Sequence, residues 1–281
     1  MPDKPTTAAG YRPEYLELVR STCLYVATKL GDLMDDTVVV GGLVPSLLID
    51  QGALAPAVEA HVGTLDLDVG LALAILEHGR YHTLTERLRR AGLTPDTNAQ
   101  GNPTRQRWKI GSPHPVTVDF LIPPSRAEDR GGRLRDIEPD FAAVIAPGLR
   151  LAFRDRTRVS LTGRTIAGEQ ATRDVWVCGA GAFIVLKALA FDLRGENKDA
   201  YDLFYVLRNF DSGPVDVAAH LRPLRAEPEA VEALRVLRRD FSAHAGVGPL
   251  RVAEFLRGTP DDDLQADAVG FVGEFLRAME E

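Results

Sequence analysis

The stretch 38–68 constrains the fold most, because it joins a glycine turn to a pair of carboxylates. It opens with Val-Val-Val-Gly-Gly, which predicts a buried strand, a turn and then a helix over 43–48. Apolar and polar residues alternate over 64–71, which predicts a second strand with Asp66 and Asp68 on one face. Residues two apart on a strand lie about 6.5–7 Å apart, so both carboxylates can reach one metal ion or two neighbouring ions.

A strand with one solvated face is the more common explanation of a lone Asp-x-Asp, but three features of this chain favour a functional site. The opposite face of this strand is apolar throughout, and unpaired carboxylates are costly inside a protein. The turn at Gly41 and Gly42 exposes backbone N–H groups that can hold a phosphate. A third carboxylate, Asp119, lies in another alternating strand over 116–120. Together these residues predict a site for metal ions and a nucleoside triphosphate.

Composition limits the class of protein. The chain has 281 residues, 45% of them hydrophobic and 26% charged, which suits one large or two small globular domains. No apolar run approaches the length of a membrane span, and the first residues lack the pattern of a signal peptide. Cys23 and Cys178 lie far apart among apolar neighbours, so we expect reduced core cysteines in a cytoplasmic protein.

The net charge of −7 argues against a protein that coats nucleic acid non-specifically, but it leaves room for a local basic patch. Many arginines gather in one middle stretch, which makes that stretch a candidate RNA contact. These arginines are Arg126, Arg130, Arg133, Arg135, Arg150, Arg154, Arg156 and Arg158. Acidic residues are interleaved with them, so a solvated surface is an equally good interpretation.

A second basic feature is the predicted strand 105–110, whose alternation places Arg105, Arg107 and Lys109 on one face. Such a face can neutralise triphosphate charge or guide a polynucleotide. Alternatively, it is an exposed edge strand that its charges protect against aggregation. The turn at Gly111-Ser112-Pro113 would join it to the Asp119 strand in a hairpin.

The remaining segments before residue 170 are assigned from periodicity and turn residues. Helices are expected over 13–30 and 81–91, a further hairpin over 149–166, a loose arm over 1–11, a connector over 51–63 and a mobile excursion over 123–147. We interpret His61, in the connector, as incidental.

The chain becomes mostly helical near residue 170, so we expect a core domain over 1–170 and a helical domain over 171–281. Lys187 lies in a predicted helix over 180–193. Asp199 suits the first turn of the next helix, where the helix dipole favours a negative charge. Asp202 lies near the apolar side of that helix. The last seventy residues are predicted to form amphipathic helices and carry no motif.

Gly-Gly, Asp-x-Asp and a later strand carboxylate resemble the catalytic signature of the polymerase β-type nucleotidyltransferase superfamily. The resemblance implies an α+β fold, with a mixed-sheet nucleotidyltransferase core and a C-terminal helical domain. It also implies that Gly41, Gly42 and Ser46 contact a nucleoside triphosphate. Three carboxylates would bind divalent metal, Mg²⁺ or Mn²⁺: Asp66, Asp68 and Asp119.

Motifs in the second half of the chain narrow the resemblance to one group of nucleotidyltransferases. Lys187, Arg194 and the run Lys198-Asp199-x-x-Asp202-Leu203 resemble the AbiEii/AbiGii-type nucleotidyltransferase toxins, which include the MenT-like toxins. The resemblance implies that Lys187 contacts the triphosphate, and that Asp202 orients this lysine or activates the acceptor hydroxyl.

The resemblance therefore implies a toxin that transfers a nucleoside monophosphate to RNA, at the 3′ acceptor end of tRNA, and so blocks translation. A cognate antitoxin protein would be its partner, and RNA contacts are expected from Arg105, Arg107, Lys109 and Arg130. Two alternatives stay open: transfer to a small molecule, as in aminoglycoside nucleotidyltransferases, and a catalytically silent nucleotide-binding protein. The full set of carboxylates weighs against the silent protein, and the helical Lys-Asp-x-x-Asp motif favours RNA over a small acceptor.

Overall fold

A computed structural model of the chain describes residues 4–56, 58–73, 80–98, 100–112 and 114–281. It divides into two compact units. Unit 1 contains Pro13–Val44 and Gly63–Cys178, and unit 2 contains Lys4–Arg12, Pro45–Val62 and Gly179–Glu281. The boundary expected between residues 170 and 171 falls at the start of the last strand of unit 1.

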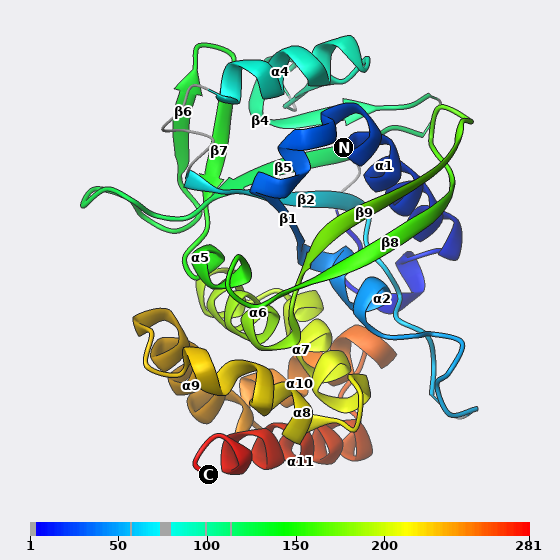
Figure 1. Ribbon diagram of the computed structural model, residues 1–281. Coiled ribbons are helices and arrows are strands. Elements are labelled where there is room, and N and C mark those ends of the chain that lie inside the picture. The colour runs from blue at the N-terminus through cyan, green and yellow to red at the C-terminus, as the bar shows by residue number, and fades with distance from the viewer. Residues whose placement is uncertain (1–3, 57, 74–79, 99, 113) are drawn as a thin grey trace. The chain divides into compact units, whose positions relative to one another are not determined.

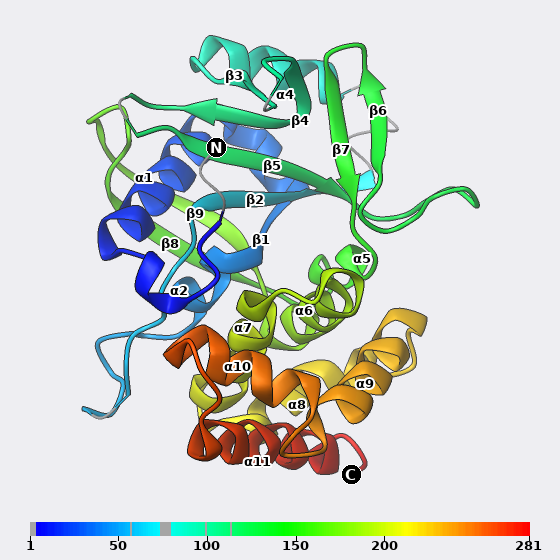
Figure 2. The same cartoon turned by 180° about the vertical axis from the view of Figure 1, so that it is seen from behind.

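Unit 1 is built on one mixed sheet, drawn in Figures 1 and 2. Its strands in the described residues are β1 (Thr37–Val40), β2 (Asp66–Leu71), β3 (Thr94–Thr97), β4 (Pro103–Ile110), β5 (Val116–Ile122), β6 (Leu134–Glu138), β7 (Phe141–Ile145), β8 (Arg156–Arg164) and β9 (Gln170–Cys178). The main order is β3-β4-β5-β2-β1-β9-β8, and β7 pairs with both β5 and β6. Parallel and antiparallel pairs both occur, which confirms the predicted α+β class with a mixed sheet.

Strands β2 and β5 are the predicted alternating strands, and they are direct neighbours. They pair in parallel, and Asp68 lies opposite Asp119. On its other side β2 pairs with β1, where Val40 lies opposite Asp68. The apolar residues between the carboxylates, Leu67 and Val118, are fully buried. Packing of these side chains in the core fixes the register of the strands. A slip of one residue would move them out of the core and turn the carboxylates into it.

The helices of unit 1 cover the sheet. Helix α1 (Pro13–Leu30) has the predicted bounds, and it packs against β8, β9 and helix α4 (Arg80–Arg90), which lies close to the prediction for 81–91. Short helical segments η2 (Gly31–Asp36) and η3 (Gly41–Leu43) precede and follow β1, and α2 (Val44–Leu48) begins at the last residue of this part of unit 1 and continues into unit 2. The predicted hairpin of β4 and β5 is confirmed, with Ile110 opposite Val116; Pro113 of its turn lies outside the described residues.

The mobile excursion expected over 123–147 is wrong. Strands β6 and β7 form an antiparallel hairpin there, and β7 also pairs in parallel with β5. Phe141 is fully buried, and its ring centroid lies 5.4 Å from that of Phe120. The prolines, glycines and arginines of this segment lie mostly in its turns. They outweighed the short apolar run of β7, whose residues belong to the core.

The hairpin expected over 149–166 is also displaced. Its first residues form a short helix, α5 (Leu149–Ala152), and the hairpin consists of β8 and β9. The two strands pair from Arg156 and Cys178 to Arg164 and Gln170. Apolar alternation in 149–152 is compatible with a helical turn as well as a strand, so periodicity could not separate the two.

Unit 2 is helical in its described residues. Its elements are η1 (Ala8–Gly10), α6 (Ala180–Arg194), α7 (Asn197–Asn209), α8 (Pro214–Leu221), η4 (Arg222–Leu224), α9 (Pro228–Phe241), α10 (Val247–Arg257) and α11 (Asp262–Ala278). Helix α7 packs against α6, α10 and α11, and α6 also packs against α8 and α9. The segment Lys4–Arg12, which includes η1, overlaps the loose arm expected over 1–11; residues 1–3 lie outside the described part of the chain.

Two further expectations concern membranes and cysteines. Among the described residues, every helix is too short or too polar to cross a membrane. Cys23 and Cys178 are buried free thiols, as expected. Burial raises the pKa of Cys23 to about 12, against the opposing charge of Arg20, so this thiol stays protonated.

Candidate functional site

The three predicted carboxylates converge in unit 1. One oxygen from each of Asp66, Asp68 and Asp119 lies within 4.8 Å of the others. Asp66 and Asp119 are buried and Asp68 is half-buried, and the Thr64 hydroxyl donates a hydrogen bond of 2.8 Å to Asp66 Oδ1. Three carboxylates this close repel one another, so they need cations. Hard divalent cations prefer oxygen ligands of this kind, and the cluster could bind a metal ion.

The glycine turn lies directly against this cluster. Gly41 has a φ of +73°, which only glycine adopts without strain. A Cβ atom added there would lie 1.9 Å from Asp68 Oδ2, so any side chain would displace the carboxylate. Gly41 is therefore required twice, for its backbone conformation and for the close approach of Asp68.

Arg107 on β4 supplies positive charge to the cluster. Its Nε donates to Asp119 Oδ1 at 2.6 Å, its Nη2 donates to Asp119 Oδ2, and Nη2 lies 4.0 Å from Asp66 Oδ2. Hydrogen bonding to Asp119 outweighs burial and raises the pKa of the Arg107 guanidinium. The arginine expected on an RNA-binding strand face is thus a partner of the third carboxylate.

The other two basic residues of that strand are also paired within the protein. Arg105 lies 2.9 Å from Asp136, and Lys109 lies 3.1 Å from Asp96. Arg130, the fourth expected RNA contact, is exposed and donates to the backbone oxygens of Ala127 and Asp129. The predicted basic face of β4 is therefore largely neutralised by its neighbours.

Lys187 and Asp202 meet in unit 2. Lys187 Nζ on α6 lies 2.7 Å from Asp202 Oδ2 and 3.0 Å from Asp199 Oδ1, both on α7. All three side chains are buried. Burial disfavours the charge on Lys187, but Asp202 and Asp199 outweigh it and raise the pKa of the ammonium. Lys187 therefore stays charged, in a position fixed by two carboxylates.

Asp199 does more than suit a helix start. It accepts hydrogen bonds from Arg194 Nε at 2.6 Å and Arg194 Nη2 at 2.8 Å, besides its contact with Lys187. Lys198 donates to Asp202 from one turn earlier on α7. The motif residues Lys187, Arg194, Lys198, Asp199 and Asp202 thus form one charged network.

His61 belongs to this network, so interpreting it as incidental is wrong. Its Nε2 lies 2.8 Å from Asp202 Oδ1, and its ring stacks on Tyr201 with centroids 5.3 Å apart. Burial, followed by the charge of Lys198, lowers the pKa of His61 to about 4. Neutral His61 must carry its proton on Nε2, because a carboxylate only accepts. This contact joins residues 141 positions apart, so no local sequence pattern predicts it.

Two residues expected at the nucleotide differ in their placement. Gly42 follows Gly41 in η3 and is buried in unit 1. Ser46 lies in α2, is half-buried, and belongs to the segment Pro45–Val62 of unit 2.

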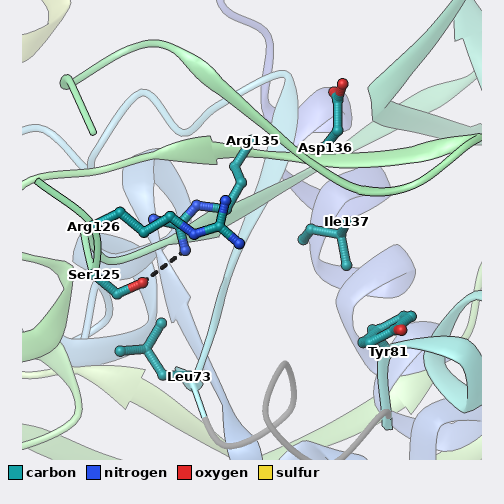
Figure 3. Close-up of a pocket in the computed structure, with 7 residues that line it drawn as sticks. All are labelled: Leu73, Tyr81, Ser125, Arg126, Arg135, Asp136 and Ile137. Carbon is teal, nitrogen blue, oxygen red and sulfur yellow. Dashed lines mark hydrogen bonds between the residues drawn. The ribbon is translucent and has the colours of Figure 1, made fainter. Parts of the chain in front are cut away.

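Unit 1 also contains a pocket of about 310 Å³. Its described lining residues are Leu73, Tyr81, Ser125, Arg126, Arg135, Asp136 and Ile137. Figure 3 shows Arg126 and Arg135 extending toward each other, whereas Asp136 points away from them. Arg135 is buried and donates to Ser125 Oγ at 2.8 Å and to Asp129. It therefore braces the β6 segment, and it is not a surface arginine available to RNA.

No protein-family model matches the chain, and no curated protein matches its sequence.

Proposed function

We propose that the chain is a metal-dependent nucleotidyltransferase of the polymerase β-like fold, which transfers a nucleoside monophosphate from a nucleoside triphosphate to RNA. One observation carries the proposal: a glycine turn lies in contact distance of Asp68, which is one of three converging carboxylates. Either feature alone is common. Their direct contact creates one place that offers backbone N–H groups to phosphate and oxygen ligands to divalent cations.

The chemistry of the ligand set fits Mg²⁺ or Mn²⁺. Asp66, Asp68 and Asp119 offer hard oxygen atoms, without the thiolate or imidazole groups that favour zinc or copper. When bound, such ions neutralise charge on the reacting phosphate and lower the pKa of a coordinated hydroxyl.

The proposed reaction exchanges one phosphoester linkage for another. The acceptor hydroxyl oxygen forms a bond to the α-phosphorus, the bond from that phosphorus to the β-phosphate oxygen breaks, and pyrophosphate leaves. The hydroxyl proton passes to a carboxylate of the cluster, for which Asp119 is the candidate, and then to solvent. The residues of this chain act mainly by holding the reacting groups in line.

The role proposed for unit 2 follows from its fixed ammonium group. Lys187 is a compact cation kept charged by Asp199 and Asp202, which is the type of group that binds a triphosphate. Asp202 in turn is oriented by His61 and Lys198. We assign Lys187 to the triphosphate, and the other residues to its positioning.

The resemblance to the AbiEii/AbiGii-type toxins supports the tRNA acceptor end as the substrate and an antitoxin protein as the partner. A small-molecule acceptor is the second candidate. It is favoured by one observation, that Arg105, Arg107 and Lys109 are each engaged by a carboxylate of the protein.

The acceptor experiment separates these candidates. The protein is incubated with Mg²⁺, total tRNA and each nucleoside triphosphate in turn, labelled on either the α- or the γ-phosphate. The proposal predicts that α-label, but not γ-label, becomes covalently attached to tRNA. Label on tRNA from the γ-phosphate would indicate a kinase, and no label on RNA with any nucleotide would contradict the RNA acceptor.

A further inference from the structure

The strands β8 and β9 form a two-stranded ribbon at one edge of the sheet of unit 1, visible in Figure 1. One face of this ribbon is its inner face, with Leu161, Val175 and Val177 fully buried. Helix α1 packs against both strands. The other face, which we call the outer face, consists of Arg156, Arg158, Ser160, Thr162, Arg164, Gln170, Thr172, Asp174, Trp176 and Cys178, as the register and strand alternation require.

Beyond its buried end at Cys178, the outer face is polar and positively charged. Its residues from 158 to 164 and from 170 to 174 are exposed. It carries three arginines, whereas Asp174 is the one carboxylate that these two fully described strands place there. In a chain with a net charge of −7, such a surface stands out against its surroundings.

The arginines of the outer face differ from those of β4 in their partners. Among the residues that the structure describes, the Arg164 guanidinium has no ion-pair or hydrogen-bond partner. Arg158 lies 3.8 Å from Asp174, and both side chains are at least half exposed, so this pair is weak in water. These cations remain available to a ligand, whereas the β4 cations are held by carboxylates.

An aromatic ring adds a second recognition element. Trp176 is partly exposed, and the guanidinium carbons of Arg156 and Arg158 lie 4.2 and 5.3 Å from its ring centroid. These cation–π contacts restrain both guanidinium groups, which reduces the entropy they lose on binding. Ser160, Thr162, Gln170 and Thr172 supply neutral hydrogen-bonding groups between the cations.

Spacing selects the class of ligand. Arg156 and Arg164 are separated along β8 by roughly 26 Å, at about 3.3 Å per residue. That length is much greater than a single phosphate group and corresponds to several consecutive phosphates of a nucleic-acid strand. A small anion can touch one end of this row but cannot span it. An extended polyanion can.

We propose that the outer face of the β8–β9 ribbon is the surface on which this protein holds its RNA. This inference rests on the proposed function, and it names the surface that binds the acceptor. On the β4 face, Arg107 pairs with Asp119 of the cluster, and Arg105 and Lys109 pair with other carboxylates.

The test measures binding of total tRNA at constant Mg²⁺ and without nucleotide, so that catalysis does not enter. Arg164→Glu is the principal variant, because this exposed side chain has no partner to lose, and R158E/R164E is the stronger one. Arg173→Glu is the matched control, since Arg173 is also exposed on the ribbon but lies on the face of Leu161 and Val175.

We expect R164E to weaken tRNA binding about threefold to tenfold at 0.1 M salt, and R158E/R164E to weaken it more than tenfold. The slope of log affinity against log salt should fall by about 0.7–0.9 for each phosphate contact removed. R173E should bind within twofold of the wild type.

Three outcomes would overturn the inference. If wild type labels tRNA with α-phosphate while both reversal variants bind tRNA unchanged, the ribbon is excluded and the proposed function stands. If R173E loses as much affinity as R164E, the effect is one of general charge and not of this face. If wild type neither binds nor labels tRNA, the RNA acceptor and the ribbon surface fail together.

Discussion

At the scale of single residues, Gly41 is required both for its backbone conformation and for the close approach of Asp68. Its positive φ lets the chain turn from β1 into η3, and its missing side chain leaves room for the Asp68 carboxylate. The approach of the turn to the carboxylates therefore depends on one hydrogen atom in place of a methyl group.

We predict that Gly41→Ala loses both metal binding and stability. A non-glycine residue at this φ costs about 1–3 kcal/mol, and the added Cβ must also push Asp68 out of the cluster. Gly92→Ala is the matched control, because Gly92 has a φ of +81° and a Cβ there would meet nothing within 4 Å. Mn²⁺ titration and urea unfolding of both variants measure the difference. Equal metal affinity in G41A and G92A would contradict the proposed contact.

Arg107 has a different effect, because it competes with a metal ion for Asp119. We predict that Arg107→Ala binds Mn²⁺ more tightly by about tenfold, or about 1.4 kcal/mol, since no guanidinium has to leave the carboxylate. Without metal, R107A should be less stable by about 1–3 kcal/mol, because Asp119 loses its hydrogen-bond donor.

Lys109→Ala is the control for Arg107, since Lys109 lies on the same strand face but pairs with Asp96. Calorimetric titration with Mn²⁺ should give K109A the wild-type affinity. Weaker metal binding by R107A would show that the arginine supports the site and does not compete for it.

His61 predicts a pH dependence of stability. Its pKa is lowered from 6.5 to about 4 in the folded protein, so the unfolded chain binds a proton that the folded chain refuses. Stability from this group is complete above pH 6.5 and is lost as the pH falls toward 4, by about 3–4 kcal/mol at 1.36 kcal/mol per pKa unit.

The variant His61→Gln keeps a hydrogen-bond donor near Asp202 but does not titrate. Urea unfolding between pH 7 and 4.5 should therefore show a shallower loss of stability in H61Q than in the wild type. His82→Gln, on exposed residue His82 of α4, controls for removing a histidine. Parallel pH profiles of H61Q and wild type would contradict this prediction, because they would show that the titration of His61 does not cause the loss of stability at low pH.

At the scale of elements, the strands β6 and β7 build the part of the sheet beyond β5. We predict that Phe141→Ala costs about 3–5 kcal/mol, the range for removing a fully buried phenylalanine. Leu134→Ala in the partner strand should cost much less, because Leu134 is 44% exposed. The denaturant midpoints of the two variants provide the comparison. An F141A midpoint equal to that of wild type would contradict the burial of Phe141 in the core.

Elements with a long, regular pattern could be predicted from the sequence, and those set by distant partners could not. Helix α1 was predicted with its observed bounds, because eighteen residues of apolar periodicity end at a glycine. The strands of Asp66 and Asp119 were predicted from strict alternation. Strand β7 was missed because it has five residues among turn-forming neighbours, and only its pairing with β5 explains its burial.

The same limit applies to the candidate site. Asp66, Asp68 and Asp119 could be chosen from strand alternation, since each has a local pattern around it. The pairing of Arg107 with Asp119 depends on the register of β4 and β5, and the contact of His61 with Asp202 depends on the folding of a connector against α7. Neither register nor tertiary contact can be read from a single local segment.

At the scale of the whole molecule, charged side chains gather in three places. Carboxylates and Arg107 gather at the glycine turn, a buried ionic network joins α6 and α7, and the outer face of the β8–β9 ribbon keeps its arginines exposed. Under the proposed function, these three places are the metal site, the triphosphate-binding cation and the RNA surface of a protein whose overall composition is acidic.

The central claim is that the three-carboxylate cluster performs nucleotide transfer, and the rate of α-label transfer to tRNA in Asp66→Asn tests it most directly. Asp96→Asn is the control, because Asp96 is also a buried carboxylate of unit 1 but pairs with Lys109 outside the cluster. We predict that D66N transfers at least about a hundredfold more slowly, equivalent to about 2.7 kcal/mol or more, with its thermal midpoint close to that of D96N. Transfer by D66N at the wild-type rate, with an unchanged Mg²⁺ dependence, would contradict the account.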